Sequence, residues 1–267
     1  MEWWLIYLLL GAIVGYIAGL FGIGGGLVIV PVLVYIFTLQ AFPVDRVLHL
    51  ALGTTMATII FTSLSSLRMH HAHGAVNWSI VKYLSPGIVL GTLTGSTLAS
   101  ALSTPVLGFI VVFFIYYAAT QMWLKLVPKP EYTLPGKGGL LVAGSVIGSI
   151  SSLVAIGGGL LTVPFLSLCK IRLQQAIGTA AAVGFPIGLT GTIGYIINGE
   201  LHTQSLPEYS LGYVYLPALG WIAAASMLTA PLGAKTTHRI ETATLKKLFI
   251  VLLYGLATKM LLDILSN

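Results

Sequence analysis

Gly22-Ile23-Gly24-Gly25-Gly26-Leu27 leads to Pro31 four residues later, and the chain contains this pattern twice. The second copy, Ala155-Ile156-Gly157-Gly158-Gly159-Leu160, leads to Pro164 with the same spacing. Laid over each other without gaps, Gly11–Thr38 and Gly144–Ile171 share 12 identities in 28 positions. The sequence around the three glycines therefore predicts a duplicated unit.

The match between the two halves continues downstream at shifted offsets. Ala51-Leu52-Gly53-Thr54 recurs as Ala176-Ile177-Gly178-Thr179, and Gly74 recurs as Gly199. Eight further residues recur later in the same order: Leu90, Gly95, Leu107, Tyr116, Ala119, Thr120, Met122 and Leu124 match Leu228, Gly233, Leu245, Tyr254, Ala257, Thr258, Met260 and Leu262. The duplication therefore covers nearly the whole chain.

The composition is that of a membrane protein. Apolar residues make up 57% of the chain and charged residues only 7%, whereas soluble domains carry roughly 25% charged residues. The first apolar stretch, Trp3–Leu20, follows Glu2 without a basic segment, so we expect it to be retained and not removed as a signal. We therefore expect a multi-pass protein of the cell (inner or plasma) membrane. Its surroundings would be the lipid bilayer, and we expect no nucleic-acid partner.

Apolar runs that stop at charges, prolines or polar clusters predict ten helical segments. They are Trp3–Phe21, Leu27–Phe37, Leu50–Met69, Ile80–Leu102 and Pro105–Leu126, then Gly138–Val154, Leu160–Cys169, Leu173–Ile197, Gly212–Leu232 and Thr244–Leu265. Most have the ~20 residues that a bilayer demands. The second segment of each half would reach only about 16 Å, because a helix rises 1.5 Å per residue. We expect each short segment to form a hairpin with the helix before it, with the Gly-rich bend inside the membrane.

Positive charge is distributed unevenly over the connections between these segments. The odd-numbered connections hold Arg68, Lys82, Lys125, Lys129, Lys137, Lys170, Arg172, Lys235, Arg239, Lys246 and Lys247, and the opposite side holds Arg46 and Lys259. By the positive-inside rule the richer side is cytoplasmic, and both termini lie outside. Because each half has an odd number of segments, the second half must run upside down relative to the first.

The sequence thus predicts an all-α integral membrane protein, built as a 5+5 inverted-repeat bundle with two short half-helix hairpins. Residues 1–127 would form the first repeat and residues 138–267 the second. Residues 128–137 would form a cytoplasmic linker. In a membrane protein, a duplicated unit interrupted by glycine at corresponding places points to a transporter's binding site.

The glycine bends are therefore the candidate substrate site. Glycine lets the backbone leave helical geometry without a Cβ clash. The short helix after each bend would expose backbone N–H groups without partners and the positive end of its dipole, both of which favour an anion. Nearby threonine hydroxyls would add donors. The predicted substrate-binding residues are Gly24, Gly25, Gly26, Gly53, Thr54, Thr55, Gly157, Gly158, Gly159, Gly178 and Thr179. The alternative is that these glycines only permit close helix packing.

One cluster of titratable residues, Arg68-Met69-His70-His71-Ala72-His73, ends a predicted helix. The spacing of His70 and His73 would allow a metal, but no cysteine or carboxylate is near them in sequence. Basic residues here also suit the helix C-terminus and lipid headgroups. We therefore expect Arg68, His70 and His73 to have a gating or interfacial role and to bind no metal.

The acidic residues all lie at or beyond predicted helix ends: Glu2, Asp45, Glu131, Glu200, Glu208, Glu241 and Asp263. Cation pathways and proton relays usually place an ionisable residue inside a membrane helix. Cation transport is therefore disfavoured, and we expect no cofactor. An anion that leaves a negative-inside cell gains about 2.3 kcal/mol per charge per 100 mV, so its export needs no coupling residue.

Three motifs together resemble a known family of transporters. They are Gly22–Gly26 with the apolar run to Pro31, Ala51-Leu52-Gly53-Thr54-Thr55, and His73-Gly74-Ala75-Val76-Asn77-Trp78. In these motifs, and over nearly its whole length, the chain resembles the sulfite exporter TauE/SafE family. The resemblance implies a small sulfur-containing anion as substrate, such as sulfite, thiosulfate, a sulfonate or sulfoacetate. The second half departs from the pattern, because Ala180 stands in place of Thr55 and the histidine segment is missing.

Residues and resemblance together predict an exporter of a small sulfur-containing anion that works by alternating access around a midplane site. An anion channel would share the helix ends, but its flux would not saturate. A proton-coupled uptake permease for an organosulfur anion is the other transport alternative. A membrane oxidoreductase would need paired histidine ligands on facing helices, and no histidine lies at the centre of a predicted segment. The sequence leaves the anion, the direction, the coupling ion and the oligomeric state open.

Overall fold

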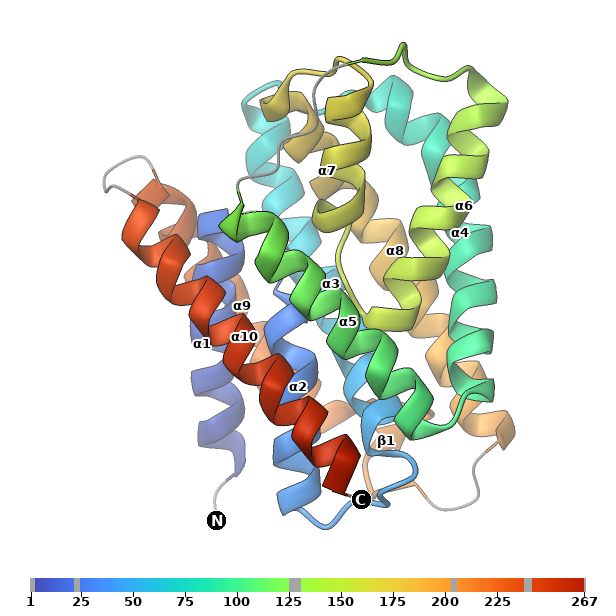
Figure 1. Ribbon diagram of the computed structural model, residues 1–267, viewed down its shortest axis with the longest axis vertical. Coiled ribbons are helices and arrows are strands. Elements are labelled where there is room, and N and C mark those ends of the chain that lie inside the picture. The colour runs from blue at the N-terminus through green and yellow to red at the C-terminus, as the bar shows by residue number, and fades with distance from the viewer. Residues whose placement is uncertain (1–2, 22–24, 125–130, 203–205, 238–241, 267) are drawn as a thin grey trace.

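Ten helices and one pair of two-residue strands make up the described part of the chain (Figure 1). The structure, a computed structural model, describes residues 3–21, 25–124, 131–202, 206–237 and 242–266. The helices are α1 (Trp3–Phe21), α2 (Gly26–Leu39), α3 (Val47–Ala72), α4 (Trp78–Ala101), α5 (Thr104–Trp123), α6 (Lys137–Val154), α7 (Gly159–Leu168), α8 (Leu173–His202), α9 (Leu216–Thr237) and α10 (Thr242–Ser266). Within this part, six helices are long and apolar enough to cross a membrane. The predicted class, an all-α multi-pass membrane protein, is confirmed.

The helix bounds differ most from the prediction in the connection between α8 and α9. The predicted helix Gly212–Leu232 begins later, at Leu216, because β1 (Ser210–Leu211) and β2 (Val214–Tyr215) pair antiparallel in front of it. Gly212 has a φ of 50°, which belongs to the left-handed region and not to an α-helix. The N–H of Tyr213 donates to the carbonyl oxygen of Tyr195 on α8 at 3.2 Å. The turn is thus fixed by a neighbouring helix.

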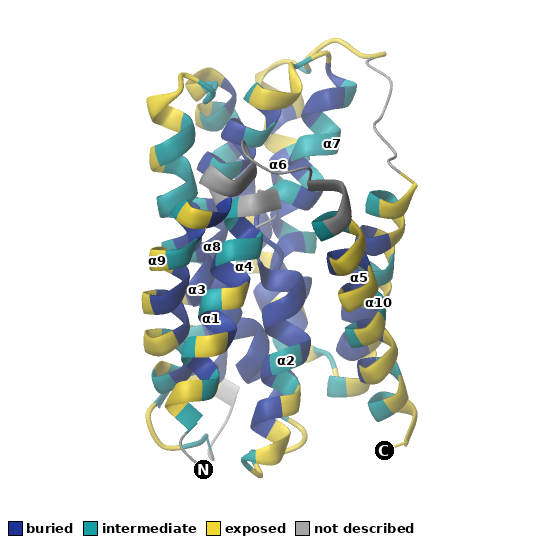
Figure 2. Ribbon diagram, turned by 90° about the vertical axis from the view of Figure 1, so that its left-hand side faces the viewer, coloured by how far each residue is buried: buried dark blue, intermediate teal, exposed yellow. Residues whose placement is uncertain are grey.

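The two short helices start at mid-height and run to opposite ends of the bundle. In Figures 1 and 2, α2 occupies the lower half of the molecule and α7 the upper half. Likewise α1 rises from the N-terminus at the bottom, whereas α6 descends from the top (Figure 1). α2 has 14 residues and α7 has 10, so neither has the ~20 needed to span a bilayer.

Each half packs mainly against helices of the other half. α1 lies along α9, and its repeat partner α6 lies along α4, while α3 packs on α8 and α5 on α10. Glycines bring the backbones together in equivalent places. A Cβ at Gly15 would clash with the backbone of Ser226, and a Cβ at the equivalent Gly148 would clash with that of Ile88. Such contacts between small residues are how membrane helices approach closely.

The pair α5 and α10 is joined by two polar contacts that are also repeat equivalents. The Tyr116 and Thr258 hydroxyls lie 2.7 Å apart, as do the Thr120 and Tyr254 hydroxyls. Within lipid such hydrogen bonds hold helices in register, each at about 1 kcal/mol.

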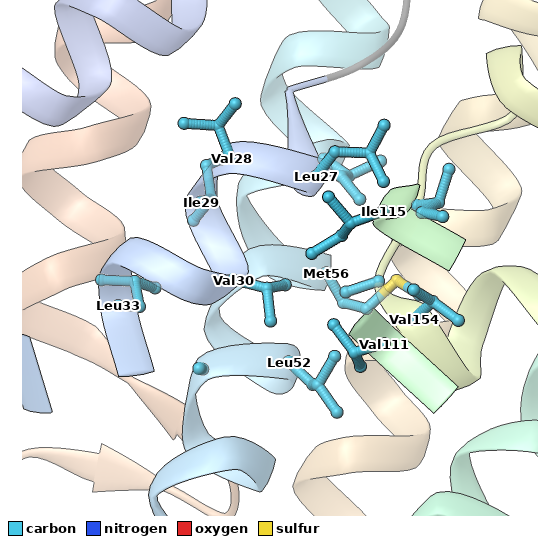
Figure 3. Close-up of a cluster of buried hydrophobic side chains, with 14 of the residues drawn as sticks. Leu27, Val28, Ile29, Val30, Leu33, Leu52, Met56, Val111, Ile115 and Val154 are labelled. Carbon is cyan, nitrogen blue, oxygen red and sulfur yellow. The ribbon is translucent and has the colours of Figure 1, made fainter. Parts of the chain in front are cut away.

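Among the six helices long enough to span a membrane, α3 is the best buried, and it lies at the centre of the bundle (Figure 2). The beginning of α2 packs beside it in an apolar cluster (Figure 3). That cluster contains Leu27, Val28, Ile29, Val30 and Leu33 of α2, Leu52 and Met56 of α3, Val111 and Ile115 of α5, and Val154 of α6. The first glycine bend is therefore followed by a helix that is surrounded by hydrocarbon side chains.

Candidate functional site

A cavity of about 620 Å³ lies between the second half of α3, the first half of α8 and the beginning of α7. It reaches residues exposed at the surface, among them His73, Arg172 and Gln174. By the charge distribution of the sequence, this is the predicted cytoplasmic side. The volume falls within the ~300–1,000 Å³ of small-molecule sites.

The second glycine bend, Gly157–Gly159, forms part of the cavity wall. Gly158 caps α7, and its carbonyl oxygen accepts the N–H of Thr162 at 3.0 Å. The N–H groups before Thr162 have no acceptor within the helix, as at every helix start. Gly158 is also required for packing, because a Cβ there would clash with the Ala180 carbonyl oxygen of α8. The bend thus presents a helix N-terminus to the cavity while it lies against α8.

The side chains around the cavity suit an anion. Its positive or ionisable groups are Arg172, His70 and His73, and its neutral polar groups are Thr62, Ser63, Ser65, Ser66, Gln174 and Gln175. Among the described residues that line it, none is an aspartate or glutamate. The positive end of the α7 dipole and the positive charge of Arg172 therefore both attract a small anion to this cavity.

The described glycines of the first bend lie beside the second bend but outside the cavity lining. Gly25, with a φ of 74°, caps α2, and neither it nor Gly26 lines the cavity. A Cβ at Gly26 would clash with the carbonyl oxygen of Ala155, just before the second bend. The two bends therefore touch, but among the described glycines only those of the second bend line the cavity. Gly24 lies outside the described residues.

Thr54 and Thr179 have equivalent roles in the fold, and each anchors a segment that precedes a helix of the other half. The Thr54 hydroxyl accepts the N–H of Tyr215, next to α9, at 3.0 Å. The Thr179 hydroxyl accepts the N–H of Asn77, next to α4, at 3.1 Å. Both threonines are fully buried and lie outside the cavity lining. The geometry therefore gives them backbone partners, where the sequence suggested a substrate.

The predicted site residues next to Thr54 and Thr179 also help to hold the two extended segments in place. Gly53 and Gly178 leave room for the carbonyl groups of Tyr213 and Ala75, which a Cβ would strike. Thr55 donates to the Ala51 carbonyl oxygen in its own helix at 2.6 Å. The motif Ala-Leu/Ile-Gly-Thr thus binds an extended segment: glycine admits its carbonyl group and threonine accepts an N–H two residues later.

Thr54→Val should lower the stability of the folded protein. It keeps the shape of the side chain but leaves the buried N–H of Tyr215 without an acceptor, which costs about 1–3 kcal/mol. Thermal unfolding of the purified protein in detergent measures the change, and Thr54→Ser, which retains the oxygen, should unfold near the wild-type temperature. A Val variant as stable as the Ser variant would show that this hydrogen bond does not hold the segment.

The histidine segment divides between cavity and surface. His70 and His73 line the cavity, whereas Arg68 is exposed and lies outside it. His71 accepts a hydrogen bond from the Trp78 indole at 3.3 Å. In the part of the chain that the structure describes, no three His, Cys, Asp or Glu side chains form a group that could hold a metal ion.

The polar residues that complete the cavity were not among the predicted site residues. Arg172, Gln174 and Gln175 stand directly before the Ala176–Thr179 motif, and Thr62–Ser66 is a hydroxyl-rich run within the apolar helix α3. Polar residues in a membrane helix usually face the bundle interior or a water-filled space. A search for hydroxyl runs on apolar helices would have found the second group. The first looked like an ordinary charged helix end.

Known proteins match the chain over nearly its whole length. The family model described as Sulfite exporter TauE/SafE matches residues 7–260. The chain belongs to the TauE/SafE family. A "Probable membrane transporter protein" of Haemophilus influenzae is 40% identical over 97% of this chain and 98% of its own length. A protein of the same description from Methanocaldococcus jannaschii is 28% identical over 90% of this chain and 89% of its own. No solved structure matches the chain.

Because the matched relatives are described as membrane transporters, this TauE/SafE chain belongs to a family of membrane transporters. The matched residues include both glycine bends, both Ala-Leu/Ile-Gly-Thr motifs and every residue that lines the cavity. The functional question for this TauE/SafE protein is therefore which substrate it carries and where that substrate binds.

Proposed function

We propose that this protein exports a small sulfur-containing anion across the cell membrane, and that the anion binds in the cavity at the beginning of α7. The observation that carries the proposal is the convergence of the Gly157–Gly159 bend, Arg172 and the two histidines on one space, with no carboxylate among the described residues that line it. Sulfur enters through the family description alone. The cavity is large enough for a sulfonate or for an oxyanion with part of its hydration shell.

We propose further that the two halves are inverted repeats that move against each other. The opposite directions of α1 and α6, and of α2 and α7, support this (Figure 1). So do the paired contacts that recur between equivalent residues in the two halves. In transporters of this design, one repeat rocks against the other around a fixed site. A cavity that reaches one surface favours this scheme over a continuous pore.

Export is the direction that needs no further coupling. On the predicted cytoplasmic side the cavity collects anions, and a negative-inside potential drives each charge outward by about 2.3 kcal/mol per 100 mV. Uptake against that potential would need a co-transported cation or proton.

Reconstituted protein should release loaded sulfite or sulfoacetate faster when the loaded side is made negative. The rate should saturate with the loaded anion and show counterflow with the same anion outside, as expected of a carrier. Protein-free liposomes and a choline-loaded sample are the controls. Flux that rises linearly without counterflow would support a channel instead. Flux that ignores the potential but acidifies or alkalises the lumen would favour proton coupling. Selectivity for choline would contradict the proposal.

A further inference from the structure

We infer that the anion pathway has a second, outward half, closed in this structure and lined by His49, Ser151 and Tyr195. This inference rests on the proposed function, since it describes where the same anion would leave. It follows from comparing four residues that line the open cavity with their equivalents in the other repeat.

The repeat offsets assign these equivalents directly from the sequence. Ala18 and Gly19, at the end of α1, correspond to Ser151 and Ser152 on α6. Gln174 corresponds to His49, and His70 corresponds to Tyr195, by the offset that relates Ala51–Thr54 to Ala176–Thr179. The first member of each pair — Ala18, Gly19, Gln174 and His70 — lines the open cavity.

On the other side, the equivalent residues are closed upon one another. The Tyr195 hydroxyl donates to the Ser152 carbonyl oxygen at 2.8 Å, and the Tyr195 side chain is fully buried. Their equivalents His70 and Gly19 instead face the cavity. The hydroxyls of Thr92 and Thr190 also contact each other across α4 and α8. Equivalent positions of the two repeats thus border open space on the cavity side and are hydrogen-bonded to each other on the opposite side.

Two buried polar atoms within the closed half have no partner. They are Nδ1 of His49 and the hydroxyl oxygen of Ser151, on side chains that are 1% and 0% exposed. Nε2 of His49 lies 3.1 Å from the Ala99 carbonyl oxygen. In the described residues the remaining unpartnered buried atoms belong to Thr162 and Ser167 of α7 and to Ser210 of β1. An unsatisfied buried polar group is costly and calls for an explanation.

The repeat provides that explanation for both atoms. Their equivalents, Gln174 and Ala18, border a space large enough for water and an anion. When the outward half opens, His49 Nδ1 and the Ser151 hydroxyl would gain water or the anion as partners. The lining would offer an imidazole and hydroxyls. The occupant that fits is therefore the same small anion with its hydration water.

Single cysteines and a membrane-impermeant thiol reagent test this inference, with Cys169 replaced by serine in every variant. Ser151→Cys should react from the outside of intact cells, and faster during transport, because only the outward-open state exposes it. Ala18→Cys, its repeat equivalent, should react only in inverted vesicles, whose cytoplasmic side faces the reagent. Ser226→Cys is the matched control: it is equally buried, lies at the α1–α9 interface, and should react from neither side.

A second variant tests the contact that closes the outward half. Tyr195→Phe removes the hydrogen bond to Ser152 and should raise the outside labelling rate of Ser151→Cys about fivefold, which corresponds to about 1 kcal/mol. Ser152→Cys provides an independent labelling position should Ser151→Cys fail to fold. Labelling of positions 18 and 151 from the same side, or of neither 151 nor 152 in cells that transport anion, would overturn the inference. If positions 18 and 151 are labelled from opposite sides but the protein transports no sulfur-containing anion, the pathway is supported and the proposed substrate is contradicted.

Discussion

Gly91→Leu should leave little folded protein in the membrane. A Cβ at Gly91 would already clash with the backbone of Ser145 across the α4–α6 contact, and leucine adds three more carbons at a place where no flexible side chain can give way. Overpacking of a tight interior costs about 1–3 kcal/mol even for small additions. Here the two helices must separate, so we expect more than about 4 kcal/mol, a large share of the ~5–15 kcal/mol that holds a domain together.

Gly220→Leu is the matched control, because it makes the same change inside a membrane helix. A Cβ at Gly220 on α9 would meet nothing within 4 Å. The yield of monodisperse protein after detergent extraction and its thermal unfolding measure both variants. We expect Gly220→Leu to equal or exceed the wild type, since glycine inside a helix is about 1 kcal/mol less favourable than other residues. Equal yields for the two leucine variants would mean that the α4–α6 contact is not close.

Arg172→Glu should reduce anion transport at least tenfold without loss of folded protein. The substitution changes the charge at the mouth of the cavity by two units, at a place where a helix N-terminus and two histidines already favour an anion. A factor of ten corresponds to about 1.4 kcal/mol, which two unit charges reach at short range even in water-like surroundings.

Arg68→Glu is the control for net charge, since Arg68 is exposed near the same end of α3 but does not line the cavity. Initial rates of sulfite or sulfoacetate efflux from liposomes measure both variants. Raising the salt concentration should narrow the difference from wild type, because screening weakens charge effects at exposed sites. If both variants lost transport equally, the loss would come from the changed surface potential of the protein and not from the changed charge in the cavity.

Most of the fold could be predicted from the sequence because its determinants are local. α1 has the predicted bounds, Trp3–Phe21, and the two short helices follow the two glycine bends. A membrane helix is an apolar run of residues with polar residues at both ends. The number of such helices can therefore be predicted from the sequence without knowledge of tertiary contacts. The β1–β2 hairpin was missed for the opposite reason. Its sequence is apolar enough to extend a helix, and only its contacts with α3 and α8 keep it extended.

The candidate site could be predicted only where one segment determines it. The Gly157–Gly159 bend lines the cavity, and its contact with a substrate stays a prediction. The partner of Thr54, by contrast, lies 161 residues away along the chain, and no local pattern reveals that distance. The prediction that Gly25, Gly26, Thr54 and Thr179 contact the anion stays a prediction, and the cavity favours Arg172, His70 and the α3 hydroxyls in their place.

The pairing of α1 with α9 delays the burial of α1 during biosynthesis. The ribosome completes α1 at Phe21 and does not begin α9 until Leu216. At about 5–20 residues per second, this partner emerges roughly 10–40 seconds later. During that interval the glycine face of α1, with Gly11, Gly15 and Gly19, must lie against lipid or the insertion machinery. A chain arrested before α9 would therefore present an unpaired first helix, which is a recognisable target for membrane quality control.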